Sequence, residues 1–248
     1  MQFGRIEDWK LIGRKNMKIK NVLAFLIATV LFFSISVYAK KAPEVQTINR
    51  NPILNKYQND KKVQELICVT PVENTNAILK MYVKDSTQDS GWALILATDA
   101  FIGKRGLGKE REGDLKTPLG EFNPTFAFGK KGNPGTTLNY IDITNDMYAC
   151  DEDCKYYNQI IDARKAKHEC KGEHLMDYIP QYNYALCIDF NPKNVFPNGS
   201  NIFIHVKGNK DYTAGCIAVD EESMMKILQN TTKKTKIVIY EYEHQFLD

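Results

Sequence analysis

The sequence predicts a mainly β protein with a sandwich- or barrel-like core, irregular insertions and one short helix near its C-terminus. Short runs with strand-like alternation recur between turn signals from residue 63 onward. The clearest helix begins after Asp220, which can cap it, and a weaker candidate covers residues 156–167. Many short strands with few helices favour a packed β fold. The clearest predicted strands are residues 65–70, 77–83, 92–98, 138–143, 184–190, 201–206 and 236–242.

Composition argues against a protein that binds polyanions in general. The 248 residues are 43% hydrophobic and 25% charged, as in an ordinary globular protein with a sizeable core. The net charge of +3 comes from residues 1–39, which hold six Lys or Arg and two acidic residues, so the remainder carries −1. Nucleic-acid affinity depends largely on neutralising phosphates, so we expect no nucleic-acid partner.

The N-terminal 39 residues have the pattern of an export signal. Lys18 and Lys20 precede an apolar run that ends in Val37-Tyr38-Ala39, a small-residue cleavage pattern. A signal peptide starting at Met17 is the favoured interpretation, and an uncleaved membrane anchor is the alternative, because the run approaches the length of a bilayer span. We expect the rest of the chain to lie outside the cytoplasm, in the periplasm or cell wall. A polar linker is predicted over 40–62, before a single domain over 63–243.

The six cysteines of an exported chain invite disulfides. Cys187 lies inside an apparent buried strand, and Cys216 has the context of a reactive thiol. The pairing of the others stays open: Cys150 and Cys154 can join each other, or either can reach Cys170. The remaining candidates for disulfides are Cys68, Cys150, Cys154 and Cys170.

A zinc site is the alternative use of these cysteines. Its spacing matches no standard zinc finger, so the sequence favours no metal. The three histidines outside the candidate active site, His168, His174 and His244, are expected to be structural or exposed. The cluster that resembles a zinc site is Cys150-x3-Cys154…His168-x-Cys170…His174.

His205 and Cys216 are the candidate catalytic pair. His205 ends a strand-like run, and Cys216 follows a glycine in a short polar turn 11 positions later, so the two can face each other across a hairpin-like connection. A thiol has a reference pKa of about 8.5, and a neighbouring imidazole raises the thiolate fraction and can later return the proton. The alternative is a buried small cysteine and a satisfied core histidine.

Gly215 strengthens the catalytic interpretation of this pair. A glycine directly before the thiol lets the backbone approach a substrate closely. Its N–H group and that of Cys216 are then free to form an oxyanion hole. Such chemistry uses the side chains alone, and we expect no cofactor.

The glycine-rich segment over residues 103–120 cannot be assigned a function by itself. It lacks the Gly-Lys-Ser/Thr end of a phosphate-binding loop, and no helix pattern follows it. We therefore expect a long polar hairpin with turns at Gly113-Asp114 and Thr117-Pro118.

Three blocks of the sequence can be taken together. They are Glu112-Gly-Asp-Leu-Lys-Thr-Pro-Leu-Gly120, Gly199-Ser-Asn-Ile-Phe-Ile-His205 and Thr213-Ala-Gly-Cys216. These blocks resemble the L,D-transpeptidase catalytic (YkuD-type) family of peptidoglycan enzymes and occur in the family's order. The similarity runs from about Val63 to Tyr240. Shorter stretches at Tyr156–Asn158 and Glu173–Leu175 resemble less constant parts of the family.

The resemblance implies an L,D-transpeptidase-type β-sandwich over residues 63–243 that acts in cell wall biogenesis. Its partners would be peptidoglycan stem peptides, whose amide between the L-centre of residue three and D-Ala four is attacked to give a thioester. An amine from a neighbouring stem then forms the cross-link. The family's pattern makes Cys216 the nucleophile, His205 its base, Gly215 and Cys216 the oxyanion donors, and Thr213 a residue that shapes the site.

Two departures from the family pattern concern the acceptor. Many members have an arginine two residues after the cysteine, where this chain has Ala218, and the His205-to-Cys216 connection is shorter than the common one. Both point to a divergent branch, some of whose relatives trim stem peptides by hydrolysis. An L,D-carboxypeptidase is therefore the first alternative, and an inactive wall-binding module is the second. The sequence predicts no oligomeric state.

Overall fold

The computed structural model describes residues 51–168 and 171–241. The export signal expected over residues 1–39, Cys170 and His244 lie outside these residues. Within the described ranges, no helix combines the length and apolarity that a membrane crossing requires.

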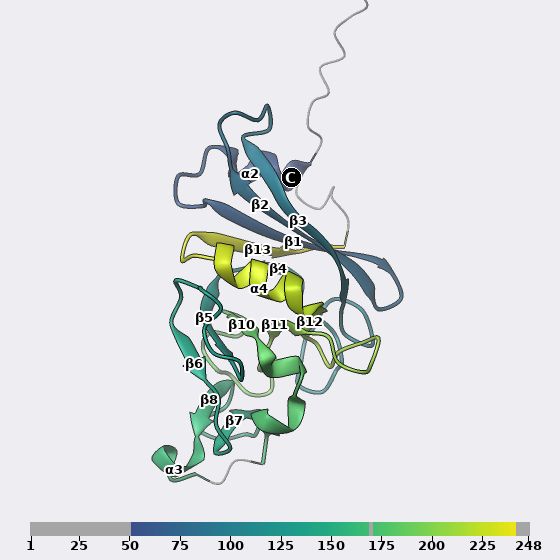
Figure 1. The fold of residues 1–248 in the computed structure, drawn as a ribbon. Helices are drawn as coiled ribbons and strands as arrows, with labels where there is room; N and C mark the ends of the chain where they lie inside the picture. Colours follow the sequence, from purple (N-terminus) through teal and green to yellow (C-terminus); the bar gives the residue numbers. More distant parts are fainter. Residues whose placement is uncertain (1–50, 169–170, 242–248) are drawn as a thin grey trace, which may run out of the picture. The chain divides into compact units, whose positions relative to one another are not determined.

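The mainly β prediction is confirmed, because one mixed ten-stranded sheet forms the body of the protein (Figure 1). Its strand order is β4-β13-β1-β2-β3-β12-β11-β10-β5-β6. All seven predicted strands correspond to strands of this sheet. The sheet consists of β1 (Glu65–Glu73), β2 (Asn76–Lys84), β3 (Trp92–Phe101), β4 (Gly120–Phe122), β5 (Pro124–Gly129), β6 (Tyr140–Asp142), β10 (Ala185–Ile188), β11 (Phe203–Val206), β12 (Ile217–Val219) and β13 (Thr235–Ile239).

The main core is enclosed by both halves of the large sheet and by the helix α4 (Glu221–Asn230). Ile67 of β1 and Ile204 of β11 belong to the same buried cluster although their strands lie far apart in the strand order. The helix begins where the sequence predicts, because the Asp220 side chain accepts a hydrogen bond from the Ser223 N–H at 2.8 Å. Burying one such apolar side chain contributes about 1.5–3 kcal/mol, so this shared core holds the two halves together.

A second core lies on the other face of β1 and is covered by a helix that the sequence analysis missed. The segment 40–62 is predicted as a linker, but α2 (Pro52–Gln58) forms within it and Asn51 caps its first turn. Ile53 and Tyr57 are buried. The Trp92 indole N–H donates to the Leu54 carbonyl oxygen at 3.0 Å, which fixes α2 beside β3. The apolar residues within this polar segment were the signal for the helix.

A small three-stranded sheet, ordered β8-β7-β9, carries most of the irregular insertion. Only the end of the weak helix candidate over 156–167 is helical. Asn158 has a positive φ of 61°, and Asp162 accepts from two N–H groups of the following turn, so the helix begins only after it. The elements here are β7 (Met147–Cys150), β8 (Gln159–Asp162), α3 (Ala163–Ala166), β9 (Glu173–His174) and the 3-10 turns η1 (Leu175–Tyr178) and η2 (Gln181–Asn183).

The long hairpin expected over residues 103–120 does not form. The segment crosses between β3 and β4 as a loop with two isolated bridges, Gly103 to Thr213 and Leu107 to Thr117. Its backbone N–H groups turn inward to one carboxylate instead of pairing along a ladder. The segment therefore lies beside the turn that carries Cys216.

Candidate active site

Neighbouring parallel strands present His205 and Cys216 on one face. The register pairs His205 of β11 with Ala218 of β12, and Cys216 immediately precedes β12. Side chains two positions apart in a strand share a face, so Cys216 lies on the same face as Ala218 and His205. The predicted hairpin-like connection is wrong in direction: the chain crosses over and re-enters parallel to β11.

The Cys216 thiol is hydrogen-bonded, and the residue as a whole is half-buried. Its Sγ accepts from the Phe203 N–H at 3.3 Å and donates to the Asn201 carbonyl oxygen at 3.3 Å. Burial raises the pKa of the Cys216 thiol to about 12, and the charge of Glu173 acts in the same direction. The Phe203 N–H and the positive charge of Lys109 oppose this rise in pKa. The thiol is therefore protonated near neutral pH.

His205 is held as a neutral imidazole with one available nitrogen. Its Nδ1 lies 2.8 Å from the Val206 carbonyl oxygen, and because a carbonyl only accepts, Nδ1 carries the proton. The Nε2 atom of the neutral ring then keeps its lone pair. Burial lowers the pKa of His205 to about 4, and the Val206 hydrogen bond only partly offsets this. The Tyr182 ring meets the imidazole edge-on, with ring centroids 5.7 Å apart.

These opposite pKa shifts define how the pair can react. A thiol with a pKa of about 12 and an imidazole with a pKa of about 4 do not exchange a proton at rest. The expectation that His205 raises the resting thiolate fraction therefore does not fit this geometry. A protonated thiol of this kind can ionise as it attacks a carbonyl, with a neutral imidazole accepting the proton as the new bond forms.

Thr213 and Gly215 shape the turn before Cys216. The Thr213 Oγ1 donates to the Cys216 carbonyl oxygen at 2.6 Å and accepts from the Gly215 N–H at 3.1 Å. The Gly215 N–H, expected to be free for an oxyanion, is thus engaged within the turn. A Cβ on Gly215 would lie 2.9 Å from the Lys116 carbonyl oxygen, and its φ is +153°. Here the glycine allows close approach of the 103–120 loop.

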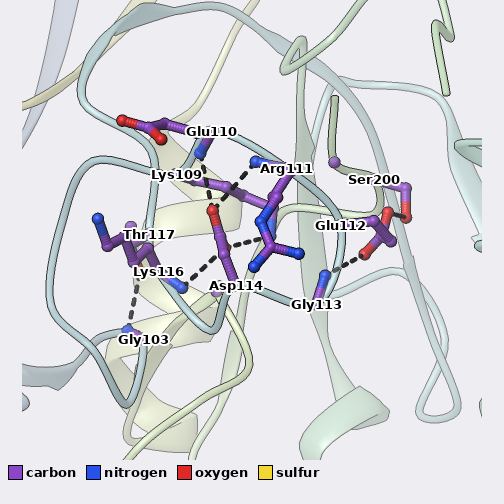
Figure 2. A network of polar contacts seen from close by, with 12 residues as sticks. Gly103, Lys109, Glu110, Arg111, Glu112, Gly113, Asp114, Lys116, Thr117 and Ser200 are labelled. Carbon is purple, nitrogen blue, oxygen red and sulfur yellow. Dashed lines mark hydrogen bonds and ion pairs between the residues drawn. The ribbon is translucent and has the colours of Figure 1, made fainter. Parts of the chain in front are cut away.

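Asp114 organises that loop (Figure 2). Its two carboxylate oxygens accept from the N–H groups of Glu110, Arg111 and Lys116 at 2.7–3.1 Å. The ammonium of Lys109, only 2% exposed, lies 3.0 Å from Oδ1. Burial alone would raise the pKa of Asp114, but these hydrogen bonds outweigh it and hold the pKa well below its ordinary value. The loop thereby places one paired, buried cation close enough to act on the Cys216 thiol.

Two recesses meet at Cys216. The wider cleft, about 480 Å³, is lined by Cys216 and His205 together with Lys104, Lys210 and other residues. The narrower recess, about 190 Å³, is lined by Cys216 and by three carboxylates. Glu173 also lines the wider cleft, where two lysines outnumber it, whereas the narrower recess has one lysine, Lys109, against three carboxylates. The carboxylates that line the narrower recess are Glu112, Asp151 and Glu173.

The carboxylates of the narrower recess repel one another. Burial raises the pKa of Glu173, and the charges of Asp151 and Glu112 raise it further. Burial likewise raises the pKa of Asp151, and Glu112 adds to this. Hydroxyl donors hold two of them in place. The Tyr182 hydroxyl donates to Glu173 at 2.7 Å. Figure 2 shows the other, in which the Ser200 hydroxyl donates to Glu112 at 2.7 Å. A bound cation would relieve this repulsion.

The sequence analysis missed the residues that surround the pair. Lys109 lies in the segment that shows no function by itself, and Asp114 lies in the first of the three blocks that resemble the family, without a role of its own. Glu173 lies in one of the two stretches with a weaker family resemblance. Tyr182 has no signal in the sequence, because only the packing of η2 against β11 brings it to His205.

A cysteine and a neutral imidazole that line the same cleft, on a mainly β fold, are the groups that cysteine nucleophilic catalysis requires. The sequence matches the L,D-transpeptidase catalytic domain family, YkuD, over residues 48–239, and the chain belongs to this family. The resemblance found in the three sequence blocks is thereby confirmed. A search among curated proteins finds no match.

Two solved structures are similar to this chain at low identity. L,D-transpeptidase from Mycobacterium smegmatis has 10% identity and a TM-score of 0.34, and covers 72% of this chain and 59% of its own. L,D-transpeptidase 1 of Mycobacterium tuberculosis has 10% identity and a TM-score of 0.30, with coverages of 71% and 62%. The chain thus spans less than two thirds of the length of either structure.

Proposed function

We propose that this chain is an exported L,D-transpeptidase that acts on the stem peptides of peptidoglycan. The observation that carries the proposal is the position of the Cys216 thiol at the meeting point of two recesses, in a member of this family. Export rests on the signal-like pattern of residues 1–39.

In the first half-reaction, Cys216 Sγ attacks the carbonyl carbon between the L-centre of stem residue three and D-Ala four. His205 Nε2 takes the thiol proton as the S–C bond forms, which avoids a free thiolate in a buried site. The C–N bond then breaks, the proton passes to the amine of D-Ala, and D-Ala leaves. A thioester on Cys216 remains, and the Cys216 N–H is the backbone donor for the oxyanion.

The second half-reaction returns the thiol. The amine of an acceptor attacks the thioester carbonyl, the C–S bond breaks, and the proton lost by the amine restores the Cys216 thiol through His205. The new amide is the cross-link. Water in place of the amine would give a shortened stem and an L,D-carboxypeptidase.

The charges of the two recesses favour transfer to an amine over hydrolysis. Lys104 and Lys210 both lie near the Tyr212 ring in the wider cleft, at 5.1 and 5.5 Å from its centroid. Cations suit the carboxylate that ends a D-Ala stem. The narrower recess pairs its lysine with Asp114 and keeps three carboxylates, which suits an acceptor that arrives as an ammonium ion. Water requires no such recess.

Product analysis tests this proposal. The purified protein is incubated with tetrapeptide muropeptides, and the products are separated by chromatography and identified by mass spectrometry. Cross-linked dimers are the expected result, whereas tripeptide monomers alone would assign the carboxypeptidase reaction. Absence of both products contradicts both the transpeptidase and the carboxypeptidase reaction. His174→Ala, a histidine held by Asp177 at 2.9 Å, is the matched control and should leave the products unchanged.

The inactive wall-binding module is tested separately with a carbapenem-type β-lactam, which acylates reactive cysteines. The expected result is one covalent adduct on the wild type and none on Cys216→Ala. An unmodified wild type would favour the inactive module.

A further inference from the structure

A second group of cysteine and histidine side chains converges in the small sheet. Cys150 ends β7, Cys154 lies in the turn that follows, and His168 comes directly after the turn of α3. The ligand atoms of the three residues all lie within 4.8 Å of one another. Three side chains from two separate segments therefore point to one place.

Two of the three distances between the ligand atoms match a tetrahedral metal centre, and the distance between the sulfurs does not fit a bond between them. The Cys150 and Cys154 sulfurs lie 3.5 Å apart, and the Cys154 sulfur lies 3.6 Å from His168 Nε2. A tetrahedral zinc with Zn–S of about 2.3 Å and Zn–N of about 2.0 Å places two sulfurs about 3.8 Å apart and a sulfur and a nitrogen about 3.5 Å apart. A disulfide needs about 2.05 Å between its sulfurs.

The surroundings of the three ligands hold them in this orientation. The Tyr156 N–H donates to the Cys154 sulfur at 3.4 Å, the kind of contact that stabilises a thiolate ligand. The Tyr156 ring packs against the His168 ring with centroids 5.0 Å apart, and its hydroxyl donates to the Ala166 carbonyl oxygen at 3.0 Å. The Glu152 carboxylate lies 3.9 Å from His168 Nε2 and adds negative charge beside the cluster.

His174 does not belong to this cluster, although the sequence groups it there. Its Nδ1 lies 2.9 Å from the Asp177 carboxylate and its Nε2 lies 2.7 Å from the Asn145 carbonyl oxygen. Both ring nitrogens of His174 therefore have other partners, so a substitution of His174 can serve as the control for a substitution of His168.

We propose that Cys150, Cys154 and His168 bind one zinc ion that fastens the small sheet. The two thiols lose their protons to solvent on binding, and two thiolates with a neutral imidazole balance the charge of Zn²⁺. Cys170, two positions after His168 in the sequence, lies outside the described residues, and the proposal is confined to the three described ligands.

Hydrogen bonds connect the cluster to the segment that contacts the Cys216 thiol, so a bound metal would also stabilise that segment. The Cys150 carbonyl oxygen accepts from the Asn158 N–H at 2.8 Å and from the Asn201 side chain at 3.2 Å. Asn201 in turn accepts the Cys216 thiol hydrogen bond. The strand β7, which Cys150 ends, pairs with β9, which carries Glu173. The small sheet has a small core of its own, and a metal compensates for such a core.

Metal analysis of the full chain, purified without chelators, tests the proposal. The expected result is about one zinc per chain in the wild type. Cys154→Ser and His168→Ala should lose most of it, while His174→Ala and Cys216→Ala should keep it. Zinc content that is unchanged in both Cys154→Ser and His168→Ala overturns the proposal. So does a zinc-free wild type with a Cys150–Cys154 disulfide, detected by peptide mass mapping.

A second measurement is decided on the wild type, so that a ligand variant that fails to fold cannot decide the outcome. Chelator-treated protein should have a lower melting temperature, and one equivalent of Zn²⁺, but not Mg²⁺, should restore it. Replacement of zinc by Co²⁺ should give thiolate-to-cobalt charge-transfer bands that His174→Ala retains. A melting temperature unaffected by chelation and by added zinc contradicts the proposal. Neither measurement depends on transpeptidase activity.

Discussion

Two parts of the chain bring cysteine next to histidine, and they differ in what the sulfur atoms face. At β11 and β12, one sulfur and one imidazole line the same cleft, and the sulfur also lines a second recess. In the small sheet, two sulfurs lie 3.5 Å apart and a ring nitrogen lies 3.6 Å from one of them. The Cys216 sulfur faces space that a substrate can enter, whereas the sulfurs of Cys150 and Cys154 and the His168 nitrogen face one another within 4.8 Å.

The contacts of each histidine ring also separate a base from a metal ligand. The Nδ1 of His205 donates to a backbone carbonyl, so its Nε2 can accept a proton and give it back. The Nε2 of His168 points at the Cys154 sulfur and lies near a carboxylate, which suits a ligand more than a base. Residue type alone therefore does not assign the chemistry, and the number of converging sulfurs does.

Replacing a sulfur at each of the two sites should give the largest difference in acylation between them. Cys216→Ala removes the proposed nucleophile, and we expect acylation by a carbapenem or a tetrapeptide to fall on the order of 10⁴-fold or more. Cys154→Ser should leave acylation within about tenfold of wild type, since it acts only through the small sheet. Adduct formation followed by intact-protein mass spectrometry measures both. Comparable losses in the two variants would show that the two sites are not separate.

The histidines give the next largest contrast. His205→Ala removes the group that takes the thiol proton, and we expect the acylation rate to fall on the order of 10²-fold or more. His174→Ala should acylate at the wild-type rate, because its ring contacts Asp177 and Asn145 and lines neither recess. Stopped-flow or time-resolved mass spectrometry of the adduct supplies the rates. A near-wild-type rate for His205→Ala would remove His205 from the mechanism.

The pH profile sharpens the assignment of His205 as a neutral base. Burial lowers the pKa of His205 to about 4, so the imidazole can accept a proton at every pH above that value. The acylation kcat/KM should therefore hold from neutral pH down to about pH 5 and fall as the pH drops through about 4. A midpoint near 6.5, the ordinary value for histidine, would mean that water reaches the ring. Circular dichroism at each pH checks that the fold persists.

Sequence patterns predict the strands of the large sheet because each of them has an apolar face toward a core. Short strands such as β12, with three residues, give no periodic signal. Periodicity also does not show whether two strands pair in parallel or antiparallel. The distance in sequence from His205 to Cys216 is compatible with a hairpin or a parallel crossover. The choice of the pair rests on residue type and spacing, and the structure corrects the direction of the connection between them.

Residues that act through tertiary contacts could not be found in this way. Lys109 reads as one charge in a polar, glycine-rich loop, and only the folded chain shows it 2% exposed against Asp114. The sequence already groups Cys150, Cys154 and His168, but their spacing matches no finger because His168 follows β8 and α3, and the spacing does not show that His174 lies elsewhere. Such sites are assembled by chain crossings, which local patterns do not record.

Asp114→Asn tests whether the inward-facing loop supports the thiol side of the comparison. The substitution leaves the Lys109 ammonium buried without its counter-charge, and removing one partner of a buried pair costs about 3 kcal/mol or more. We expect the free energy of unfolding in urea to fall by about that amount, with slower acylation at Cys216. Asp162→Asn is the matched control: its ion-pair partners Arg164 and Lys165 are 66% and 86% exposed, and asparagine still caps α3, so the loss should stay below about 1 kcal/mol. Equal losses would contradict a special role for the buried pair.

The smallest effect concerns which acceptor reaches the thioester. Glu173→Gln keeps an oxygen to accept the Tyr182 hydroxyl hydrogen bond but removes a negative charge from the narrower recess. An ammonium acceptor then loses about 1 kcal/mol of attraction in a site that water screens, so the ratio of dimer to tripeptide should fall about fivefold. Acylation should not slow, because loss of the Glu173 charge lowers the pKa of Cys216. Glu222→Gln, an exposed carboxylate on α4, should leave the ratio unchanged. A ratio unchanged in both variants would mean that the carboxylates of this recess do not select the amine.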